Sequence, residues 1–362
     1  MRSWVVPFDI GAILIAVALA LVAPPALWIE HHYTNGFYLP LNTVLRPLVD
    51  ALPISIADVL LLAFVALLVV LWVRALRRTG RSRAARVGRA ALHTLGALAI
   101  VFVWFKVFWG FNYQRVSMSE KVPVRATAVV QPAVDAFGNH VIRMLNANVD
   151  AAHAELGSRH GGPALDEAAV RARIAPVEQR VFALFGDAEF VAMPEVKPTL
   201  FDPVMGKSGD TGFMDPWTHE VNLYSGQLPF ERPSTFAHEW AHVAGFADEA
   251  EANYIAVLAC INSDSPLARY SGWLMVWENL PHDIHVTERA RGQVHDDVEA
   301  IIARLKRQIN RNFARGRSVA YDRYLKANRV AAGIGSYQLF VRWMVGATYG
   351  PDGLPHVNPS AG

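Results

Sequence analysis

Apolar residues gather in three long runs near the N-terminus, whereas polar and apolar positions alternate along the rest of the chain. The runs cover residues 10–29, 54–72 and 90–109. Each is close to the length that a helix rising about 1.5 Å per residue needs to cross a hydrocarbon core of about 30 Å. We therefore expect three transmembrane helices within a membrane domain of residues 1–116.

The segment between the second and third runs is strongly basic. Residues 74–89 read RALRRTGRSRAARVGR, which contains seven arginines and no acid. A short basic loop between two spans belongs on the cytoplasmic side of an inner or plasma membrane, so it indicates topology and not a nucleic-acid partner. The N-terminus is then cytoplasmic, and the chain after Trp109 lies outside. A cleaved signal peptide is the alternative for the first run, since Arg2 precedes it. Pro24 and Pro25 near the outer end of this run suggest a kink or an exit into the membrane interface.

Residues 117–362 are expected to form one extracytoplasmic domain. Apolar positions recur at helical spacing in 131–156 and 165–185. Glycine and proline become frequent from 186 to 233, and short extended runs such as EFVAM lie between them. The charged stretch 284–313 predicts a solvated helix. The predicted fold class is therefore a mainly α membrane protein with a mostly helical outer domain and a small β-sheet.

Three shorter stretches complete this pattern. The apolar residues of 30–53 favour a helix lying in the membrane interface. The sequence WGFNYQR (109–115) predicts an aromatic belt where the third span leaves the membrane. The last apolar stretch, 333–346, contains Gln338 and Arg342 and is short, so we expect a packed helix of the outer domain.

Composition adds two constraints. The hydrophobic fraction is 52% and the mean hydropathy is +0.20, which agrees with membrane-embedded segments. Cys260 is the only cysteine, so an intramolecular disulfide and a four-cysteine zinc site are both excluded. Because Cys260 ends the apolar run YIAVLAC, we expect a buried thiol without a catalytic role.

The clearest chemical signal is HEWAH, in which His238, Glu239 and His242 form the H-E-x-x-H pattern. Residues four apart on a helix lie one turn above each other, so both imidazoles can bind one zinc ion from the same face. Glu239 lies beside that ion, where it can take a proton from an activated water molecule and hand it to a leaving amine. The alternative is a core helix whose histidines hydrogen-bond to the backbone.

A third protein ligand is needed, with one coordination position left for water. Gly245 can end the motif helix in a left-handed conformation. Asp248 then fits as the N-cap of the next helix, with Glu251 completing a capping box. That assignment makes Glu249 the first choice of metal ligand, ahead of Glu251 and Asp248. Asn253, one turn after Glu249, is a candidate for orienting a ligand.

HEWAH followed by EAEAN (249–253) resembles the gluzincin zinc peptidases, in which a glutamate of the following helix completes the site. The separation of His242 and Glu249 is shorter than in thermolysin. With the three spans, WGFNYQR, GFMDPWTHEVNLY and YDRYLKANRV, nearly the whole chain resembles an uncharacterised family of bacterial membrane-anchored zinc metallopeptidases. The resemblance implies a zincin-like domain, a zinc cofactor and a membrane location, and it leaves the substrate open.

Two further features of a peptidase have candidates in the sequence. HEVNLY (219–224) is either an edge strand that binds an extended peptide or an ordinary hairpin strand. A donor that stabilises the tetrahedral intermediate is sought among Tyr270, His282, His285, His295, Tyr321 and Tyr324. We therefore expect a zinc-dependent hydrolase of peptides or proteins, anchored in the lipid bilayer. The alternative is a membrane-anchored binding or assembly protein whose metal only holds the fold, and the sequence leaves the oligomeric state open.

Overall fold

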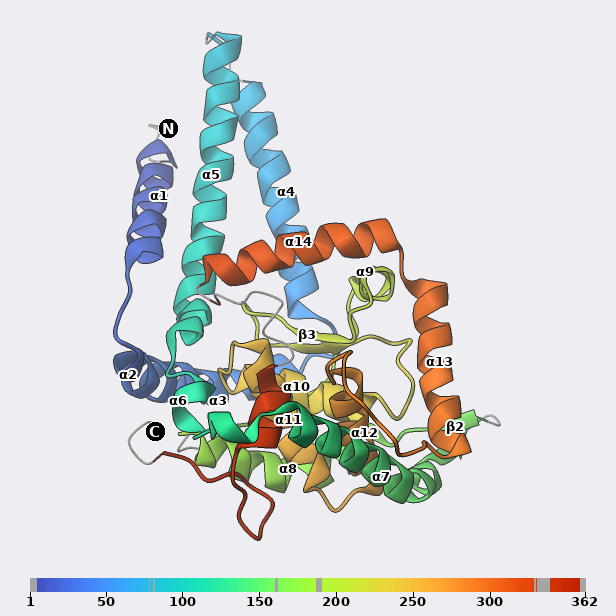
Figure 1. The fold of residues 1–362 in the computed structure, drawn as a ribbon. Coiled ribbons are helices and arrows are strands. Elements are labelled where there is room, and N and C mark those ends of the chain that lie inside the picture. The colour runs from blue at the N-terminus through green and yellow to red at the C-terminus, as the bar shows by residue number, and fades with distance from the viewer. Residues whose placement is uncertain are drawn as a thin grey trace.

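The computed structural model describes residues 5–77, 79–80, 82–159, 162–186, 191–328, 330 and 339–358. Its helices form a long stalk and a rounded body (Figure 1). The stalk contains α1 (Val5–Leu21), α4 (Ile56–Leu76) and α5 (Arg83–Phe108). Among the described residues, α4 and α5 are each long and apolar enough to cross a membrane, and a third span results if α1 and the bent segment after it count as one.

The helices α4 and α5 form a hairpin that points away from the body, and the arginine-rich loop joins them at its far end (Figure 1). A hydrogen bond of 2.8 Å from Trp72 Nε1 to Thr94 Oγ1 fixes their register. The third predicted run is part of a longer helix, because α5 already begins at Arg83 within the basic segment. Ser82 caps that start by accepting a hydrogen bond from the Ala85 N–H.

The first predicted span differs from the structure. Instead of one helix over 10–29, α1 ends at Leu21, and the chain bends by 117° before it continues at Ala26. Pro24 and Pro25 lie at this bend, where proline's missing N–H prevents the helical hydrogen-bond ladder from continuing. The predicted run of residues 10–29 is therefore two separate helical segments.

Because α1 begins earlier than predicted, Asp9 lies within it. Its carboxylate contacts the Nδ1 of His93 on α5 at 2.6 Å, and both side chains are buried. The approach depends on Gly96, since a Cβ there would stand 2.5 Å from an Asp9 oxygen. This pair satisfies two polar groups that would otherwise be costly in an apolar helix bundle.

After the bend, three short helices cross the body, and we call them the strap. They are α2 (Ala26–Trp28), the π-helix η1 (Ile29–Tyr38) and α3 (Leu39–Asp50). Tyr38 and Asn42 both donate hydrogen bonds to the Val243 carbonyl, at 2.9 and 3.1 Å, and so hold the strap against the helix that carries HEWAH. The expected interfacial helix is thus fastened to the body, although Val44 and Leu48 remain exposed on its outer side.

The expected aromatic belt at 109–115 belongs to the core instead. The segment forms η2 (Gly110–Gln114), and Trp109, Asn112 and Arg115 are buried. Arg115 binds the buried Glu30 of the strap through two hydrogen bonds of 2.6 and 3.0 Å, so the charge of each group is compensated. This pairing of distant segments could not be foreseen from local composition.

The body is built around α11 (Glu249–Ile261), whose residues from Glu249 to Cys260 are all buried. A helix that is enclosed all round needs neighbours on every side. They are α8 (Glu167–Leu184), α10 (Arg232–Val243), α12 (Pro266–Glu278) and α15 (Leu339–Gly346), and α7 (Gln131–Glu155) packs against α12 in the same core. The predicted helices at 131–156 and 165–185 are confirmed. Cys260 is fully buried as predicted, and burial raises the pKa of its thiol.

The C-terminal stretch behaves as expected where it is described. Residues 331–338 lie outside the described part, and α15 packs Phe340 and Val341 into the core, so it is a helix of the body. The same core contains Ile29, Tyr33 and Trp109 from the N-terminal side of residue 116. The domain boundary at 116 stays a prediction, while the packing runs across it.

The remaining elements surround this core. They are α6 (Met118–Lys121), η3 (Ala126–Ala128), β1 (Gly157–Arg159), β2 (Gly162–Ala164), α9 (Asp202–Ser208), β3 (Gly212–Met214), β4 (Val221–Leu223), α13 (Gly292–Gln308) and α14 (Arg311–Ala327). The strands form two antiparallel pairs, β1 with β2 and β3 with β4. The stretch 284–313 is not one helix, because a loop precedes α13 and the chain turns before α14. Of EFVAM, only residues 191–193 are described, and they are not a strand.

The stalk is fastened to the body at the start of α4. The carboxylate of Glu220, next to β4, accepts hydrogen bonds of 2.8 Å from the N–H groups of Ile56 and Ala57 and from Lys197. The carboxylate thereby satisfies two donors that the first turn of a helix leaves free. The hairpin of α4 and α5 is therefore fixed to the same small sheet that borders the candidate site.

Candidate metal centre

The motif helix α10 begins with a proline in its first turn and ends just after HEWAH. Gly245 follows the helix with a φ of +89°, as predicted for a left-handed C-terminal cap. A Cβ at this position would also stand 3.2 Å from both Arg115 and Asn112. Glycine therefore allows both the turn and the close approach of the buried segment below it.

The turn leads directly into α11. Asp248 is its N-cap and accepts a hydrogen bond of 2.8 Å from the Ala250 N–H, as predicted. The predicted capping box does not form, because the carboxylate of Glu251 instead accepts a hydrogen bond of 2.7 Å from the Met118 N–H. Both acids thus have structural partners, and Glu249 is the one that faces α10.

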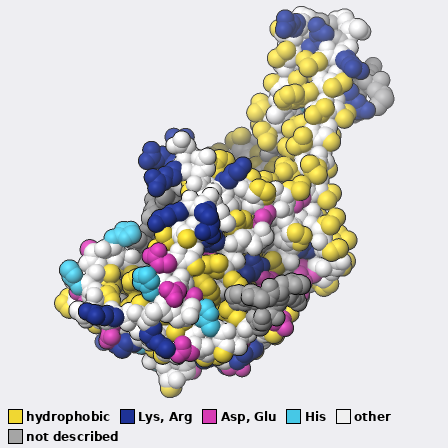
Figure 2. Space-filling view, turned by 90° about the vertical axis from the view of Figure 1, so that its right-hand side faces the viewer, with side chains coloured by type: hydrophobic (Ala, Val, Ile, Leu, Met, Phe, Trp, Pro, Cys, Tyr) yellow, Lys and Arg dark blue, Asp and Glu magenta, His cyan; other side chains and the backbone are white. Residues whose placement is uncertain are grey.

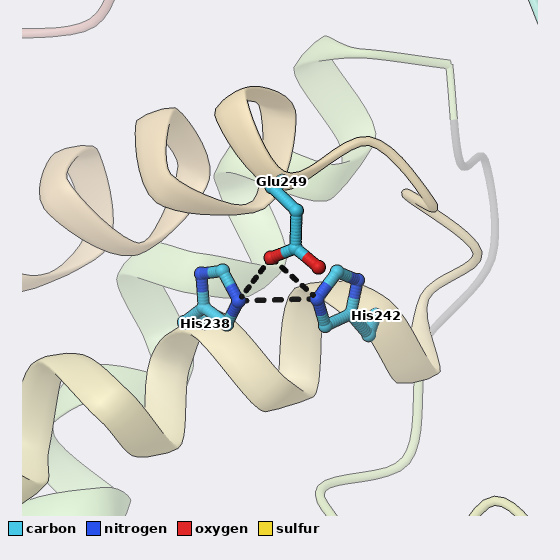
Figure 3. Close-up of side chains that lie close together, drawn as sticks. All are labelled: His238, His242 and Glu249. Atoms are coloured by element: carbon cyan, nitrogen blue, oxygen red, sulfur yellow. Dashed lines mark hydrogen bonds and ion pairs between the residues drawn. The ribbon is translucent and has the colours of Figure 1, made fainter. Parts of the chain in front are cut away.

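Glu249 meets both motif histidines (Figure 3). Its Oε2 lies 3.1 Å from His238 Nε2 and 3.5 Å from His242 Nε2, and the two Nε2 atoms are 3.1 Å apart. Ligand atoms about 2.0–2.1 Å from a tetrahedral zinc ion stand about 3.4 Å from each other. The donor set and its spacing therefore fit a zinc ion, and in the described part of the chain these three residues form the group that could hold it.

The tautomer of His242 suits metal binding. Its Nδ1 lies 2.7 Å from the Phe246 carbonyl oxygen, which can only accept, so Nδ1 keeps its proton when the ring is neutral, and the Nε2 lone pair of the neutral ring points at the cluster. The Nδ1 of His238 is buried and has no hydrogen-bond partner among the described residues. One of the two imidazoles is therefore oriented by the backbone, and the other by packing.

Glu249 and His242 stabilise each other's charged forms. Burial alone would raise the pKa of Glu249 and lower that of His242, but in both groups the attraction between the opposite charges outweighs the effect of burial. The histidines hold the pKa of Glu249 well below its usual value, and Glu249 raises the pKa of His242 to about 9. A divalent cation would replace these protons as the partner of the carboxylate.

Glu239 lies next to the cluster and is also buried. Burial raises its pKa to about 6, and its Oε2 has no hydrogen-bond partner among the described residues. Gly212 lets the carboxylate sit against β3, because a Cβ there would stand 2.6 Å from Glu239 Oε1. A buried carboxylate with an unpaired oxygen is costly unless a further partner such as water or substrate arrives.

A cavity of about 880 Å³ opens on Glu239 and on all three residues of the cluster. The strand that borders it is β3, whereas HEVNLY takes the second of its two predicted roles, an ordinary hairpin strand. This segment contains β4, which pairs with β3 on one side and contacts Val196 on the other. The backbone N–H groups of Asp215 and Tyr224 donate hydrogen bonds across the β3–β4 pair. Hydrogen-bonded and non-hydrogen-bonded positions alternate along an antiparallel pair, so the N–H and C=O groups of Gly212 and Met214 point away from β4.

The other wall of the cavity comes from α14. Tyr321 donates a hydrogen bond to Glu249 Oε1, and Arg317 pairs with Asp210 at 2.7 Å. Tyr113 donates to the hydroxyl of Tyr324 at 3.3 Å. Sequence reasoning missed Arg317 and Asp210, because their pairing depends on the path of α14 and leaves no local pattern.

Of the six candidates for a stabilising donor, Tyr321 and Tyr324 line the cavity. Tyr270 is fully buried elsewhere and donates to Asp297 at 2.7 Å. His282, His285 and His295 are not among the cavity-lining residues. Asn253 does line the cavity, one turn along α11 from Glu249, as the spacing predicted.

No curated protein and no solved structure matches the chain significantly. Residues 33–345 match a family model described as "Protein of unknown function (DUF3810)", and this range includes the strap from Tyr33 onward, α4, α5 and every residue of the cluster. Since the match covers most of the 362 residues, the chain belongs to the DUF3810 family.

Proposed function

We propose that this protein is a membrane-anchored, zinc-dependent hydrolase that cleaves peptide bonds. The observation that carries the proposal is the convergence of His238 Nε2, His242 Nε2 and Glu249 Oε2 at the wall of a cavity. Three protein ligands with open space beside them are typical of catalytic zinc sites, which keep one coordination position for water or substrate.

The residues around the cluster supply the parts of a hydrolytic site. A zinc ion held there would polarise the scissile carbonyl and a water molecule. Glu239 is placed to accept the proton of the attacking water and to pass it to the leaving amine. Tyr324 accepts from Tyr113, so its own O–H proton is available to stabilise the negative charge that develops on the carbonyl oxygen.

Substrate binding is assigned to β3. The outward N–H and C=O groups of Gly212 and Met214 can pair with the backbone of an extended peptide, which adds a strand to the edge of the sheet. This contact recognises a main chain rather than particular side chains. It favours a peptide or protein substrate over a small hydrolysable ester.

We further propose that the body lies outside the cytoplasmic membrane. The arginine-rich loop sits at the end of the stalk farthest from the body (Figure 1), so a bilayer crossed by α4 and α5 separates the two. Short loops rich in arginine stay on the cytoplasmic side. The metal cluster then faces the periplasm or cell exterior.

A purely structural metal site is the competing function. Such sites are closed by four protein ligands, whereas the described residues bring three ligand groups together beside a cavity of about 880 Å³. The unpaired carboxylate oxygen of Glu239 also has no use in a structural site. Both observations favour catalysis.

The test combines metal analysis with an assay on the purified full-length protein. We expect one zinc per chain and cleavage of a mixed-sequence peptide library, with Glu239→Gln keeping the zinc and losing about 100- to 10,000-fold of the rate. Glu299→Gln, an exposed acid on α13, is the matched control and should keep full activity. Zinc without any peptide cleavage, or full activity in Glu239→Gln, would reject the proposal.

A further inference from the structure

The cavity does not end at the metal cluster. Its walls also include Leu98, Val101, Phe102 and Phe105 of α5, one of the two helices in the described part of the chain that are long and apolar enough to cross a membrane. A single cavity therefore connects the proposed catalytic residues with the apolar surface of a span. A water-soluble peptide has no need of such a wall.

The register of the hairpin places this wall at membrane depth. The Trp72–Thr94 hydrogen bond sets the two residues side by side. Since antiparallel helices rise equally, Leu98 lies at the depth of roughly residue 68 of α4. Around that depth, Leu67 and Val69 are 50% and 54% exposed, as expected of side chains that face lipid.

The span is also fixed rigidly to the site. Trp217, in the turn between β3 and β4, donates a hydrogen bond of 3.0 Å to the Val101 carbonyl, and its ring packs 6.1 Å from that of Phe105. At the end of the span, Trp109 stands edge-on to His242 at 6.2 Å. The apolar wall therefore keeps its position relative to the metal cluster.

The helix α14, which forms one wall of the cavity, lies on the same side of the body as the stalk. Figure 1 shows α14 crossing beside α5 there, and the rings of Phe105 and Tyr324 are 6.0 Å apart. Its outer surface exposes the cations Arg311, Arg315, Arg323 and Lys326. Figure 2 shows Lys and Arg side chains gathered on the face of the body from which the apolar stalk rises. A basic helix in this place suits the anionic surface of a bilayer.

We propose that the substrate is a peptide held in the bilayer by an apolar anchor, and that its anchored end enters the cavity along α5. This inference rests on the proposed peptidase function and adds the substrate class. The anchor would fill the end walled by Leu98 and Phe102, while the adjoining peptide pairs with β3 and reaches Glu239. Hydrolysis consumes one water molecule: a C–O bond forms at the carbonyl carbon, the C–N bond breaks, and the amine takes up a proton.

The test uses the full-length, zinc-loaded protein in phosphatidylethanolamine and phosphatidylglycerol vesicles. One mixed-sequence peptide library is prepared in two forms, N-acetylated and N-palmitoylated. Any anchor raises the local concentration of substrate, so the decisive quantity is the ratio of the two rates in matched variants. Leu98→Gln changes the cavity wall, and Ile100→Gln changes an equally exposed aliphatic residue of α5 outside the cavity lining.

We expect the palmitoylated library to be cleaved faster, and the ratio to fall roughly ten-fold in Leu98→Gln but not in Ile100→Gln. A ratio that is the same in all three proteins would overturn the inference and leave the peptidase proposal intact. Absence of any cleavage by wild type would instead reject the peptidase proposal.

A second readout does not depend on turnover. In the Glu239→Gln protein, a palmitoyl chain that carries a photoreactive diazirine should label Leu98 and Phe102, and excess unlabelled anchored peptide should remove this labelling. Labelling of Ile100 comes from bulk lipid and should not be competed. Equal labelling of Leu98 and Ile100 that excess unlabelled peptide does not remove would overturn the inference, even if peptides are cleaved.

Discussion

Tyr321 of α14 donates a hydrogen bond to Glu249 of α11, 72 residues earlier in the chain. The bond uses Glu249 Oε1, while Oε2 faces the two histidines. A carboxylate held in this way presents one defined oxygen to a metal. The helix α14, which forms one wall of the cavity, therefore also orients the candidate ligand Glu249.

Removing this hydroxyl tests the connection. We expect Tyr321→Phe to lower zinc affinity by about 10- to 100-fold, the usual effect of losing a group that orients a ligand. Zinc titration against a competing chelator measures it. The control is Tyr349→Phe. This change removes a hydroxyl that is hydrogen-bonded to Tyr254 at 3.2 Å, and Tyr349 is not among the residues that line the cavity. Equal zinc affinity in the two variants would contradict the role of Tyr321.

The identity of the third ligand can be decided by two isosteric changes. Glu249→Gln removes the negative charge that faces the histidines, so the purified protein should lose its zinc. Glu251→Gln should keep it, because the carboxylate of Glu251 is engaged with the Met118 N–H and an amide oxygen can still accept that bond. Metal content after dialysis gives the answer, and the reverse result would make Glu251 the ligand.

Glu178 predicts a pH-dependent stability unrelated to the metal. It is fully buried on α8, neither carboxylate oxygen has a partner among the described residues, and burial raises its pKa well above 4.5. As pH rises above 4.5, the unfolded chain loses this proton before the folded protein does. The free energy of unfolding should therefore fall by about 1.4 kcal/mol per pH unit until the folded pKa is reached.

Glu178→Gln removes that titration. The difference in melting temperature between this variant and wild type should grow in the variant's favour from pH 5 upward, measured in detergent micelles. Glu299→Gln on the exposed face of α13 should show no such trend. A difference that stays constant with pH would mean that Glu178 is paired in the folded protein.

The proposed topology can be read with single cysteines, because Cys260 is buried and unreactive. Thr79→Cys lies in the arginine-rich loop and Val319→Cys on the exposed side of α14. We expect a membrane-impermeant maleimide to label position 319 in intact spheroplasts and position 79 only after lysis. The opposite pattern would place the body in the cytoplasm.

Much of the candidate site could be predicted from local sequence. Helical periodicity places His238 and His242 on one face, the glycine at 245 predicts the sharp turn, and the N-cap preference of Asp248 leaves Glu249 to face the histidines. Each of these depends on residues within a few positions of one another. Local rules therefore suffice for this part.

Features that depend on distant packing could not be predicted in this way. The aromatic residue Trp109 reads as a belt residue because its partner His242 is far along the chain. The choice between β3 and β4 as the edge strand depends on the contact of β4 with Val196. Pro24 and Pro25 indicate a kink near the outer end of the first run, but local sequence does not give its size, a bend of 117° that divides the run into two helical segments.

X-ray diffraction from crystals of the full-length protein at the zinc absorption edge would show whether the three side chains bind one zinc ion. We expect one anomalous peak per chain, about 2.0–2.2 Å from His238 Nε2, His242 Nε2 and a carboxylate oxygen of Glu249. An anomalous map without a peak between these three side chains, in protein purified with zinc present, would contradict it.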